Sequence, residues 1–426
     1  MRRNMMTAFI AGSMIVLVPS LAFAQEVTND MDPASDVTRY LLDSGLLILG
    51  GLAGLVLIAG FALRDIGLSR TLNAPAVCLR TIGALALTVF AFWLSGYQLL
   101  FGVETNGVLG EFGVWSPRDE DPAALGYSSG AFWFFHMVLA AFGAMIVSSA
   151  VSERVRLWPF LFFAFIWSVL IYPIVASWAW GGGYFASEWS FHDIGGAGVI
   201  HVSAGAAALA AVMVVGPRNG RYAQGPGRPA VSTALPLSAF GVMLAIVGMM
   251  LVIAGLSGSF SSVEAAISLG KMLSNAMLAM AGGSLAAMVL TQTVYKRTGL
   301  VSAMTGAIAG IVSISAEPLG PALWQAAMIG AVGGVIITVT PPFFDRYRID
   351  DAGLSIPTHL LCGFWGVLIA FWVNEDVWLI GQALGVVAIA AFSFSMSLLI
   401  WVAVKYTIGV RSAPLDEPSF SDPTNG

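Results

Sequence analysis

Two of the four histidines in the sequence share the same surroundings, and both lie within apolar runs. Each follows an aspartate by eight residues and precedes a glycine by four; the two sets are Asp193, His201 and Gly205, and Asp351, His359 and Gly363. An imidazole can donate or accept a hydrogen bond and changes its charge near neutral pH. For a single histidine, the alternative is a packing role, with a hydrogen bond to a neighbouring helix.

The composition places these residues in a lipid bilayer. Of the 426 residues, 58% are hydrophobic and 10% are charged, whereas soluble domains carry roughly 25% charged residues. An ionisable side chain inside a membrane is costly, so each histidine predicts a functional site. The net charge of −5 excludes the basic face that a nucleic-acid partner requires. The histidine pair has no third ligand at metal spacing, so neither a metal nor a cofactor is expected.

The amino terminus has the features of a secretory signal peptide. Two arginines precede the apolar stretch 6–21, and the small residues Ala22 and Ala24 supply a cleavage site. We predict that residues 1–24 are cleaved and that the mature chain begins at Gln25. The alternative is an uncleaved first transmembrane helix.

The mature chain consists of apolar runs of about the 20 residues that a helix needs to cross a bilayer. Helices are expected because open strands would leave backbone groups without hydrogen bonds in lipid. The eleven predicted spans are 40–63, 77–102, 130–152, 157–180, 194–216, 234–256, 270–293, 299–316, 321–340, 353–373 and 377–404. Residues 25–404 are therefore predicted to be an all-α polytopic transmembrane domain, and residues 405–426 a cytoplasmic tail.

The basic residues predict the orientation of these helices. Most of them follow odd-numbered spans, which favours a cytoplasmic location for those loops. They are Arg64, Arg70, Arg154, Arg156, Arg218, Arg221, Arg228, Lys296, Arg297, Arg346, Arg348, Lys405 and Arg411. A cleaved signal places the amino terminus outside, and an odd number of spans then places the carboxyl terminus inside.

The two histidine segments lie in the fifth and tenth predicted spans. Because five is odd, the second five helices cross the membrane in the opposite sense to the first, as in inverted-repeat transporters. We predict two inverted five-helix repeats plus a final helix, with His201 and His359 meeting near the midplane. Asp193 and Asp351 begin their helices and are predicted to cap them.

Further motifs, in order along nearly the whole mature chain, resemble those of the Amt/Mep/Rh ammonium transporters. Both histidine segments match the family, as DxxGxxxxH at 193–201 and DD…HxxCGxWG at 350–366. The other matches are Ala62-Leu-Arg64 with Gly67-Leu-Ser-Arg70 and Asn73, Gly96-Tyr-Gln-Leu-Leu-Phe-Gly102, Ser152-Glu-Arg154, Trp180-Gly-Gly-Gly183 and Thr305-Gly-Ala-Ile-Ala-Gly310. Their order makes the resemblance specific.

This resemblance implies a homotrimer with one pore in each subunit. In the family, an outer vestibule recruits ammonium, paired aromatic rings gate an apolar pore, and twin histidines line its centre. Trp180 is then the recruitment residue, since an indole ring holds a cation well. His201 and His359 would accept a hydrogen bond and relay a proton, and Ser315 would be the pore hydroxyl.

The chain departs from the family at the gate and the vestibule. The first gating phenylalanine aligns with Leu139, although Phe134 and Phe135 lie one turn earlier. The second becomes Val252, and the recruitment serine becomes Leu256. The lost hydroxyl removes a hydrogen bond worth about 1 kcal/mol, so we expect weaker recruitment or a more open pore.

Two further regions carry expectations of their own. His136 and His192 are candidates for vestibule or loop positions, and we expect them to make local hydrogen bonds rather than to act directly. The tail keeps the start of the family pattern at Gly409-Val-Arg411 but lacks its acidic, glycine-containing docking segment. This speaks against control by a PII-type regulator.

The sequence thus predicts a transporter for ammonium or ammonia in the bacterial inner membrane, serving nitrogen uptake. Ammonium would lose its proton at an external vestibule before conduction through the twin-histidine pore. One alternative is an ammonium sensor that binds and conducts poorly, and another is a channel for a different small neutral gas. An enzyme is not expected because no nucleophile, metal set or cofactor motif accompanies the histidines.

Overall fold

The structure, a computed structural model, describes residues 35–70, 73–104, 107–120, 125–223, 232 and 234–411. The predicted signal peptide and most of the predicted tail lie outside these residues. The described residues form helices joined by loops, with one isolated β-bridge between Val155 and Arg411. The all-α prediction is therefore confirmed for this part of the chain.

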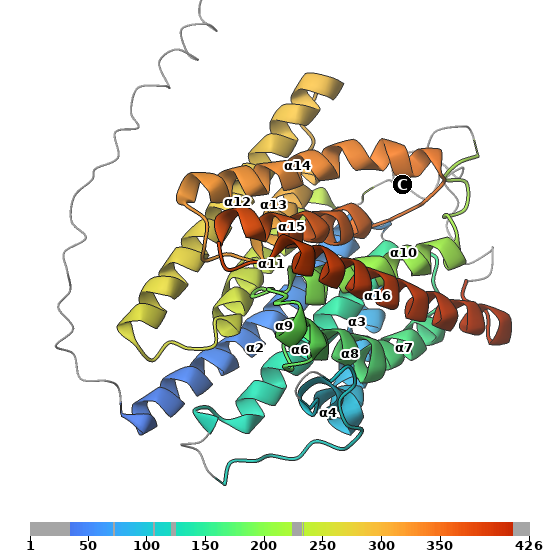
Figure 1. The fold of residues 1–426 in the computed structure, drawn as a ribbon. Helices are drawn as coiled ribbons and strands as arrows, with labels where there is room; N and C mark the ends of the chain where they lie inside the picture. The colour runs from blue at the N-terminus through green and yellow to red at the C-terminus, as the bar shows by residue number, and fades with distance from the viewer. Residues whose placement is uncertain are drawn as a thin grey trace, which may run out of the picture. The chain divides into compact units, whose positions relative to one another are not determined.

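The helices follow one another along the chain (Figure 1). Two of the rods contain an internal π-helical turn, labelled η, and two others begin with one. In order, the elements are α2 Asp36–Leu68; α3 Ala74–Ala91, η2 Phe92–Gly96 and α4 Tyr97–Phe101; α6 Ser129–Ala150; α7 Leu157–Ile166, η3 Trp167–Ile171, α8 Tyr172–Ala179 and α9 Tyr184–Glu188; η4 Ala197–Val202 and α10 Ser203–Val215; α11 Leu235–Leu256; α12 Val263–Tyr295; α13 Leu300–Ile314; α14 Leu323–Arg346; η5 Ile356–Leu361 and α15 Cys362–Val373; and α16 Leu379–Thr407.

Each predicted span falls on a helix, and ten helical segments in the described chain are long and apolar enough to cross a membrane. The remaining one, α13, is apolar but has 15 residues, fewer than the roughly 20 that a span needs. The protein is therefore polytopic, and the count of eleven spans stays a prediction.

Two helices begin earlier than hydropathy predicts. The hydroxyl of Ser35 accepts a hydrogen bond from the Thr38 backbone, and that of Ser262 accepts one from Ala265. These N-caps stabilise first turns that are too polar to register as membrane spans. As a result α2 starts at Asp36 and α12 starts at Val263.

The centre of the bundle is formed by α6 and by the η4–α10 rod. From Phe135 to Ala150 every residue of α6 is buried, and α10 is buried at all but two positions. Around them, α2 and α11 pack side by side although they are far apart in the chain (Figure 1). A methyl group on Gly60 would lie 2.6 Å from the Gly241 carbonyl oxygen, so small residues permit this close contact.

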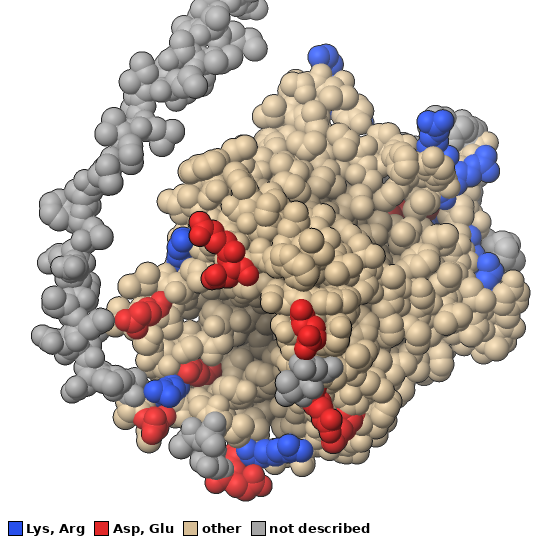
Figure 2. Space-filling model, viewed as in Figure 1, with Lys and Arg blue, Asp and Glu red and all other residues tan. Residues whose placement is uncertain are grey.

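Charged side chains gather at the two ends of the bundle. Figure 2 shows acidic groups around a hollow in the surface, whereas most of the visible Lys and Arg side chains lie at the other end. Between the ends, the exposed side chains of the helices are largely apolar, as at Ile82, Phe240 and Leu399. This pattern suits a surface that lipid covers.

A buried ion-pair network ties together the loops at the basic end. The Arg218 guanidinium lies 2.7 Å from the Glu153 carboxylate and 2.8 Å from that of Asp350. Arg154 donates to the backbone carbonyls of Gly216, at 2.7 Å, and of Asp350. Burial alone would raise the pKa of Asp350, but Arg218 outweighs it and holds that pKa well below its ordinary value.

We expect Arg218→Met to destabilise the protein by about 3–5 kcal/mol, because it leaves two buried carboxylates without their partner. Arg346→Met is the matched control, since Arg346 is exposed at the end of α14 and surface substitutions usually change stability by no more than about 0.5 kcal/mol. Thermal unfolding in detergent measures both. Equal midpoints for the two variants would contradict a structural role for the buried network.

Candidate functional site

His201 in η4 and His359 in η5 meet in the interior of the bundle. Their Nδ1 atoms are 3.1 Å apart although the residues are 158 positions apart in sequence. The ring centroids are 5.0 Å apart with an interplanar angle of 27°, and both side chains are buried. At this distance one nitrogen carries a hydrogen and the other accepts it. The structure thus brings together the two residues that the repeated spacing singled out.

Each histidine lies in a π-helical turn, a wider turn that occurs frequently at functional sites. The first of these turns begins after Gly196, whose φ of 81° is a left-handed conformation that favours glycine. The Asp193 carboxylate accepts hydrogen bonds from Gly198 and Val199 at 2.9 and 2.8 Å. This local geometry fixes the start of the helix that carries His201.

Asp351 has the corresponding position before the second histidine. Its Oδ2 accepts a hydrogen bond from the backbone of Ile356 at 2.6 Å. Burial raises the pKa of Asp193 to about 6, against the opposing effect of its backbone hydrogen bonds, and it also raises the pKa of Asp351. The hydrogen bonds that these two carboxylates accept place both of them at helix starts. The Trp180 indole separately donates to the backbone carbonyl of Asp193 at 2.7 Å.

The glycines that follow the histidines lie where the two rods cross. A methyl group on Gly205 would be 2.4 Å from the Leu360 backbone nitrogen, and one on Gly363 would be 2.7 Å from the Ala197 carbonyl oxygen. Each glycine thus touches the backbone of the opposite histidine turn. This close crossing is what allows the two imidazoles to reach each other.

Two phenylalanines that the sequence analysis missed enclose the histidines. The ring of Phe142 lies edge-on to His201 at 6.0 Å and to His359 at 6.3 Å, and Phe61 lies 5.8 Å from His359. Phe142 follows Phe135 by seven residues, which is two turns along the same face of α6. The spacing between Phe135 and Phe142 is the feature of the sequence that could have identified Phe142 as a site residue.

A small cavity lies beside His201. Its volume is about 10 Å³, near the smallest that holds one water molecule. Val252 and Ser315, two of the predicted site residues, line it, and the Ser315 hydroxyl donates to the Ile311 carbonyl at 2.7 Å. The other lining residues are Leu57, Phe142, Gly195, Ile200, Met249 and Ile253. Apart from His201 and Ser315, the lining side chains are apolar.

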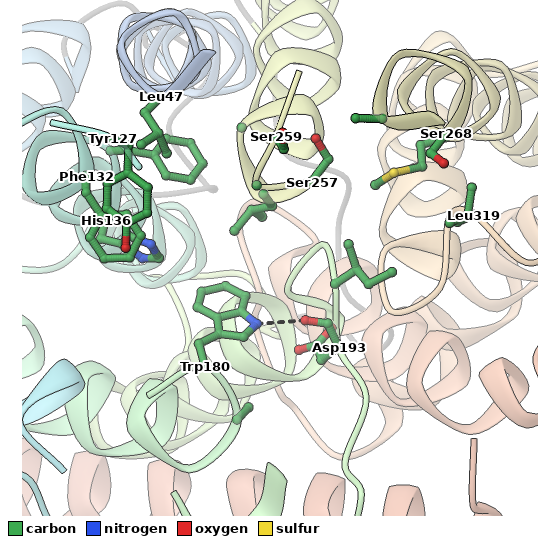
Figure 3. Close-up of a pocket in the computed structure, with 18 of the residues that line it drawn as sticks. Leu47, Tyr127, Phe132, His136, Trp180, Asp193, Ser257, Ser259, Ser268 and Leu319 are labelled. Atoms are coloured by element: carbon green, nitrogen blue, oxygen red, sulfur yellow. Dashed lines mark hydrogen bonds between the residues drawn. The ribbon is translucent and has the colours of Figure 1, made fainter. Parts of the chain in front are cut away.

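A much larger cavity, of about 690 Å³, opens at the acidic end. We call it the vestibule. Trp180 and Asp193 line one side, and aromatic residues of α6 line another (Figure 3). On α11, Gly255 and Leu256 line the vestibule whereas Val252 lines the small cavity. The two cavities are therefore about one helical turn apart along α11.

The gate candidates divide into two groups. Phe135 lines the vestibule and is packed against Gly50 and Gly255, and Val252 lines the small cavity. Phe134 instead packs against Gly51 of α2, and neither it nor Leu139 lines either cavity. Phe134 and Phe135 are adjacent on α6, so their side chains point about 100° apart. Of the two, only Phe135 lines the vestibule.

The vestibule contains aromatic residues that the sequence analysis did not assign to it. Phe132 and His136 lie one turn apart on α6, with ring centroids 4.4 Å apart, and Phe101 lies 4.8 Å from His136. Tyr127 stacks on Phe132 at 4.8 Å. His136 does not make the expected local hydrogen bond: its buried Nδ1 has no partner among the described residues.

The other vestibule histidine does have a partner. His192 Nε2 lies 2.8 Å from the Glu317 carboxylate, which also accepts from Asn374 at 2.6 Å. Burial acts to lower the pKa of His192, but Glu317 outweighs it and raises that pKa. Burial conversely acts to raise the pKa of Glu317, and its hydrogen bonds lower it. Within the described residues, no group of three or more potential metal ligands is present.

Residues 46–423 match the sequence profile of the Ammonium Transporter Family. The chain belongs to this family. It is accordingly a multi-pass membrane transport protein and not an enzyme.

Individual relatives align with nearly the whole of this chain. Ammonium transporter Amt2 of Archaeoglobus fulgidus is 28% identical over 95% of this chain and 91% of its own length. A putative ammonium transporter of Synechocystis sp. is 31% identical over 96% and 93%. A solved structure named "Sensor Amt Protein" has a TM-score of 0.83 at 25% identity, covering 90% of this chain and 98% of the other. Mep2 of Candida albicans, with a TM-score of 0.79 and 23% identity over 89% and 88%, shows the same fold.

We expect Gly205→Ala to destabilise the protein by about 1–3 kcal/mol, because the new methyl group would overlap the backbone of η5. Thermal unfolding in detergent measures this as a lower midpoint. Gly45→Ala is the matched control, since a methyl group there meets nothing within 4 Å. If Gly205→Ala matches this control, the helices do not cross as closely as described.

The His192–Glu317 pair predicts a pH dependence of stability. Because the pKa of His192 is raised, its contribution is full below its ordinary value of 6.5 and is lost as pH rises through the raised value. Because the pKa of Glu317 is lowered, its contribution is full above 4.5 and is lost as pH falls. The thermal midpoint of the wild type should therefore exceed that of His192→Gln most between these values. A difference that does not vary with pH would rule out the ion pair.

Proposed function

We propose that this protein is an ammonium transporter in which ammonium loses a proton at an external vestibule and crosses as a neutral species through a twin-histidine pore. The observation that carries the proposal is the contact between the buried Nδ1 atoms of His201 and His359. The pair lies beside an apolar cavity, one helical turn beyond an aromatic vestibule at the acidic end of the bundle.

The sizes and linings of the two cavities support deprotonation before passage. The vestibule is wide, and the acidic groups around it favour a cation. Trp180 offers an indole ring to that cation. The cavity beside His201 holds about one small molecule and is mainly apolar, so an ion entering it would lose its hydration without replacement. A neutral molecule avoids most of that cost.

The histidine pair supplies what an apolar cavity lacks. A neutral imidazole presents one donor and one acceptor nitrogen, so it can hydrogen-bond a small polar solute. Because the two Nδ1 atoms share one hydrogen, protonation of either ring changes the role of the other, and the pair titrates as a unit. We propose that His201 and His359 relay a proton in this way, and that Ser315 contributes the pore hydroxyl.

The remaining architectural predictions belong to the same proposal. We propose eleven spans, arranged as two inverted five-helix repeats plus α16. A pseudo-two-fold axis between the repeats would explain why Gly205 and Gly363 make equivalent contacts with each other's histidine turns. We propose a homotrimer in the bacterial inner membrane, with the vestibule and amino terminus outside. The basic end and the carboxyl terminus would then be cytoplasmic.

An ammonium sensor is the second candidate function. Two observations favour it: the protein named "Sensor Amt Protein" has a closely similar structure, and Leu139 and Val252 stand where the family has gating phenylalanines. Of the gate candidates, Phe135 is the ring that lines the vestibule. A sensor would bind ammonium at the vestibule and conduct little.

Ammonium-evoked charge movement in proteoliposomes tests the proposal. We expect a saturable, ammonium-specific signal for the wild type and a loss of at least tenfold in the signal for His201→Ala and for His359→Ala, because either change removes the shared hydrogen bond. Cys78→Ala, at an exposed cysteine, and empty liposomes are the controls.

The other outcomes discriminate between the functions. A silent wild type that ammonium still stabilises against thermal unfolding would favour the sensor. A silent wild type that ammonium does not stabilise would mean that the substrate is different. A full signal from both alanine variants would overturn the twin-histidine pore.

A further inference from the structure

We propose that His136 is a direct ligand of the ammonium cation in the vestibule, with a ring nitrogen as the hydrogen-bond acceptor. This inference rests on the proposed function and adds a recognition residue to it. The proposal begins from a buried polar atom, His136 Nδ1, that has no hydrogen-bond partner among the described residues. Leaving such an atom without a partner costs about 1–3 kcal/mol, so its retention in an apolar helix requires a reason.

The position of the ring indicates what the partner is. His136 lies on α6 and lines the vestibule, with 5% of the residue exposed. Its ring nitrogens are directed toward the cavity (Figure 3). The ring centroids of Trp180 and His136 are 6.0 Å apart. On the other side of the indole, the backbone carbonyl of Asp193 accepts a hydrogen bond from Trp180 Nε1 (Figure 3). A solute in the vestibule can therefore meet His136 and Trp180 together.

The neighbours of His136 form an aromatic box. Ring centroids of Phe132, Phe101 and Phe135 lie 4.4, 4.8 and 5.4 Å from that of His136. Aromatic faces attract cations but cannot accept a strong directed hydrogen bond. A ring nitrogen supplies that acceptor. The combination suits a small cation that has N–H donors and disfavours an alkali cation, which has none.

The vestibule hydroxyls of Ser257 and Ser259 donate their hydrogens to other groups, and their oxygens keep lone pairs that can accept. Ser257 donates to the Ala254 carbonyl at 2.6 Å, and Ser259 donates to the Asp43 carboxylate at 3.0 Å. Leu256, which stands where the family pattern has a recruitment serine, lines the same vestibule. His136 therefore adds an acceptor on α6 to the serine oxygens at the end of α11.

Other charged groups around the vestibule do not replace this acceptor. The Glu317 carboxylate is engaged by His192, Asn374 and the backbone of Leu319 and Gly320. Asp193 Oδ1 is a second buried polar atom without a partner among the described residues, but Asp193 lies on the far side of the indole from His136 (Figure 3).

The experiment compares the ammonium dependence of charge movement in proteoliposomes for the wild type, His136→Phe and His136→Gln. His136→Phe keeps an aromatic ring without an acceptor, and His136→Gln keeps an acceptor without the ring. We expect the half-saturating ammonium concentration to rise about tenfold in His136→Phe, as loss of one hydrogen bond to a charged group implies. His136→Gln should stay within about threefold of the wild type.

Further arms separate binding from conduction and from folding. The half-saturating concentration, rather than the maximal signal, is the measure of binding in this comparison. Met145→Leu, at a buried position on the same helix, is the control for repacking of α6. If His136→Phe does not fold, His136→Met, which also lacks a strong acceptor, takes its place. Ammonium stabilisation against thermal unfolding provides the same comparison without transport.

The two proposals fail in different ways. A wild type with a saturable signal and a His136→Phe variant with unchanged half-saturation would overturn the role of His136 and leave the transporter intact. Equal increases for the Phe and Gln variants would assign His136 to packing and would also overturn its role as a ligand. A wild type that ammonium neither drives nor stabilises would overturn the proposed function itself.

Discussion

The close crossing of the two histidine rods is the constraint on which the rest of the site depends. Gly205 and Gly363 place backbone against backbone, and only at that separation do the imidazole nitrogens come within 3.1 Å. The buried aspartates fix where each rod begins, and the phenylalanine rings close the space around the pair. The crossing thus converts two separate helix positions into one hydrogen-bonded unit.

The two ends of the bundle complement that unit in different ways. At the acidic end, an aromatic vestibule can hold a cation through ring faces and a few acceptors, without carrying it into the apolar interior. At the basic end, Arg154 and Arg218 tie the loops to one another through buried hydrogen bonds. The vestibule and the buried ion-pair network therefore lie at opposite ends of the bundle, with the histidines between them.

Much of this arrangement could be predicted from the sequence. Apolar run length located the helices, and the repeated Asp–His–Gly spacing identified His201 and His359, because both signals are local. The lining of the vestibule was harder to predict. Whether Phe134 or Phe135 faces the cavity depends on the rotation of α6, which tertiary packing sets. Phe61 comes from a distant helix, and no local pattern pairs it with His359. The capped extension of α12 was missed because polar first turns do not resemble a membrane span.

The π-helical turns at the two histidines have a consequence for how the chain tolerates changes in length. Such a turn holds one residue more than an α-helical turn, so deleting a single residue there would restore an ordinary helix. The imidazole would shift with the narrower turn, whereas a deletion in the α-helical part of the rod would rotate everything beyond it by about 100°. Either change would alter the position of the imidazole relative to the aspartate before it and the glycine after it. The count of residues from cap to glycine is thus as restrictive as their identities.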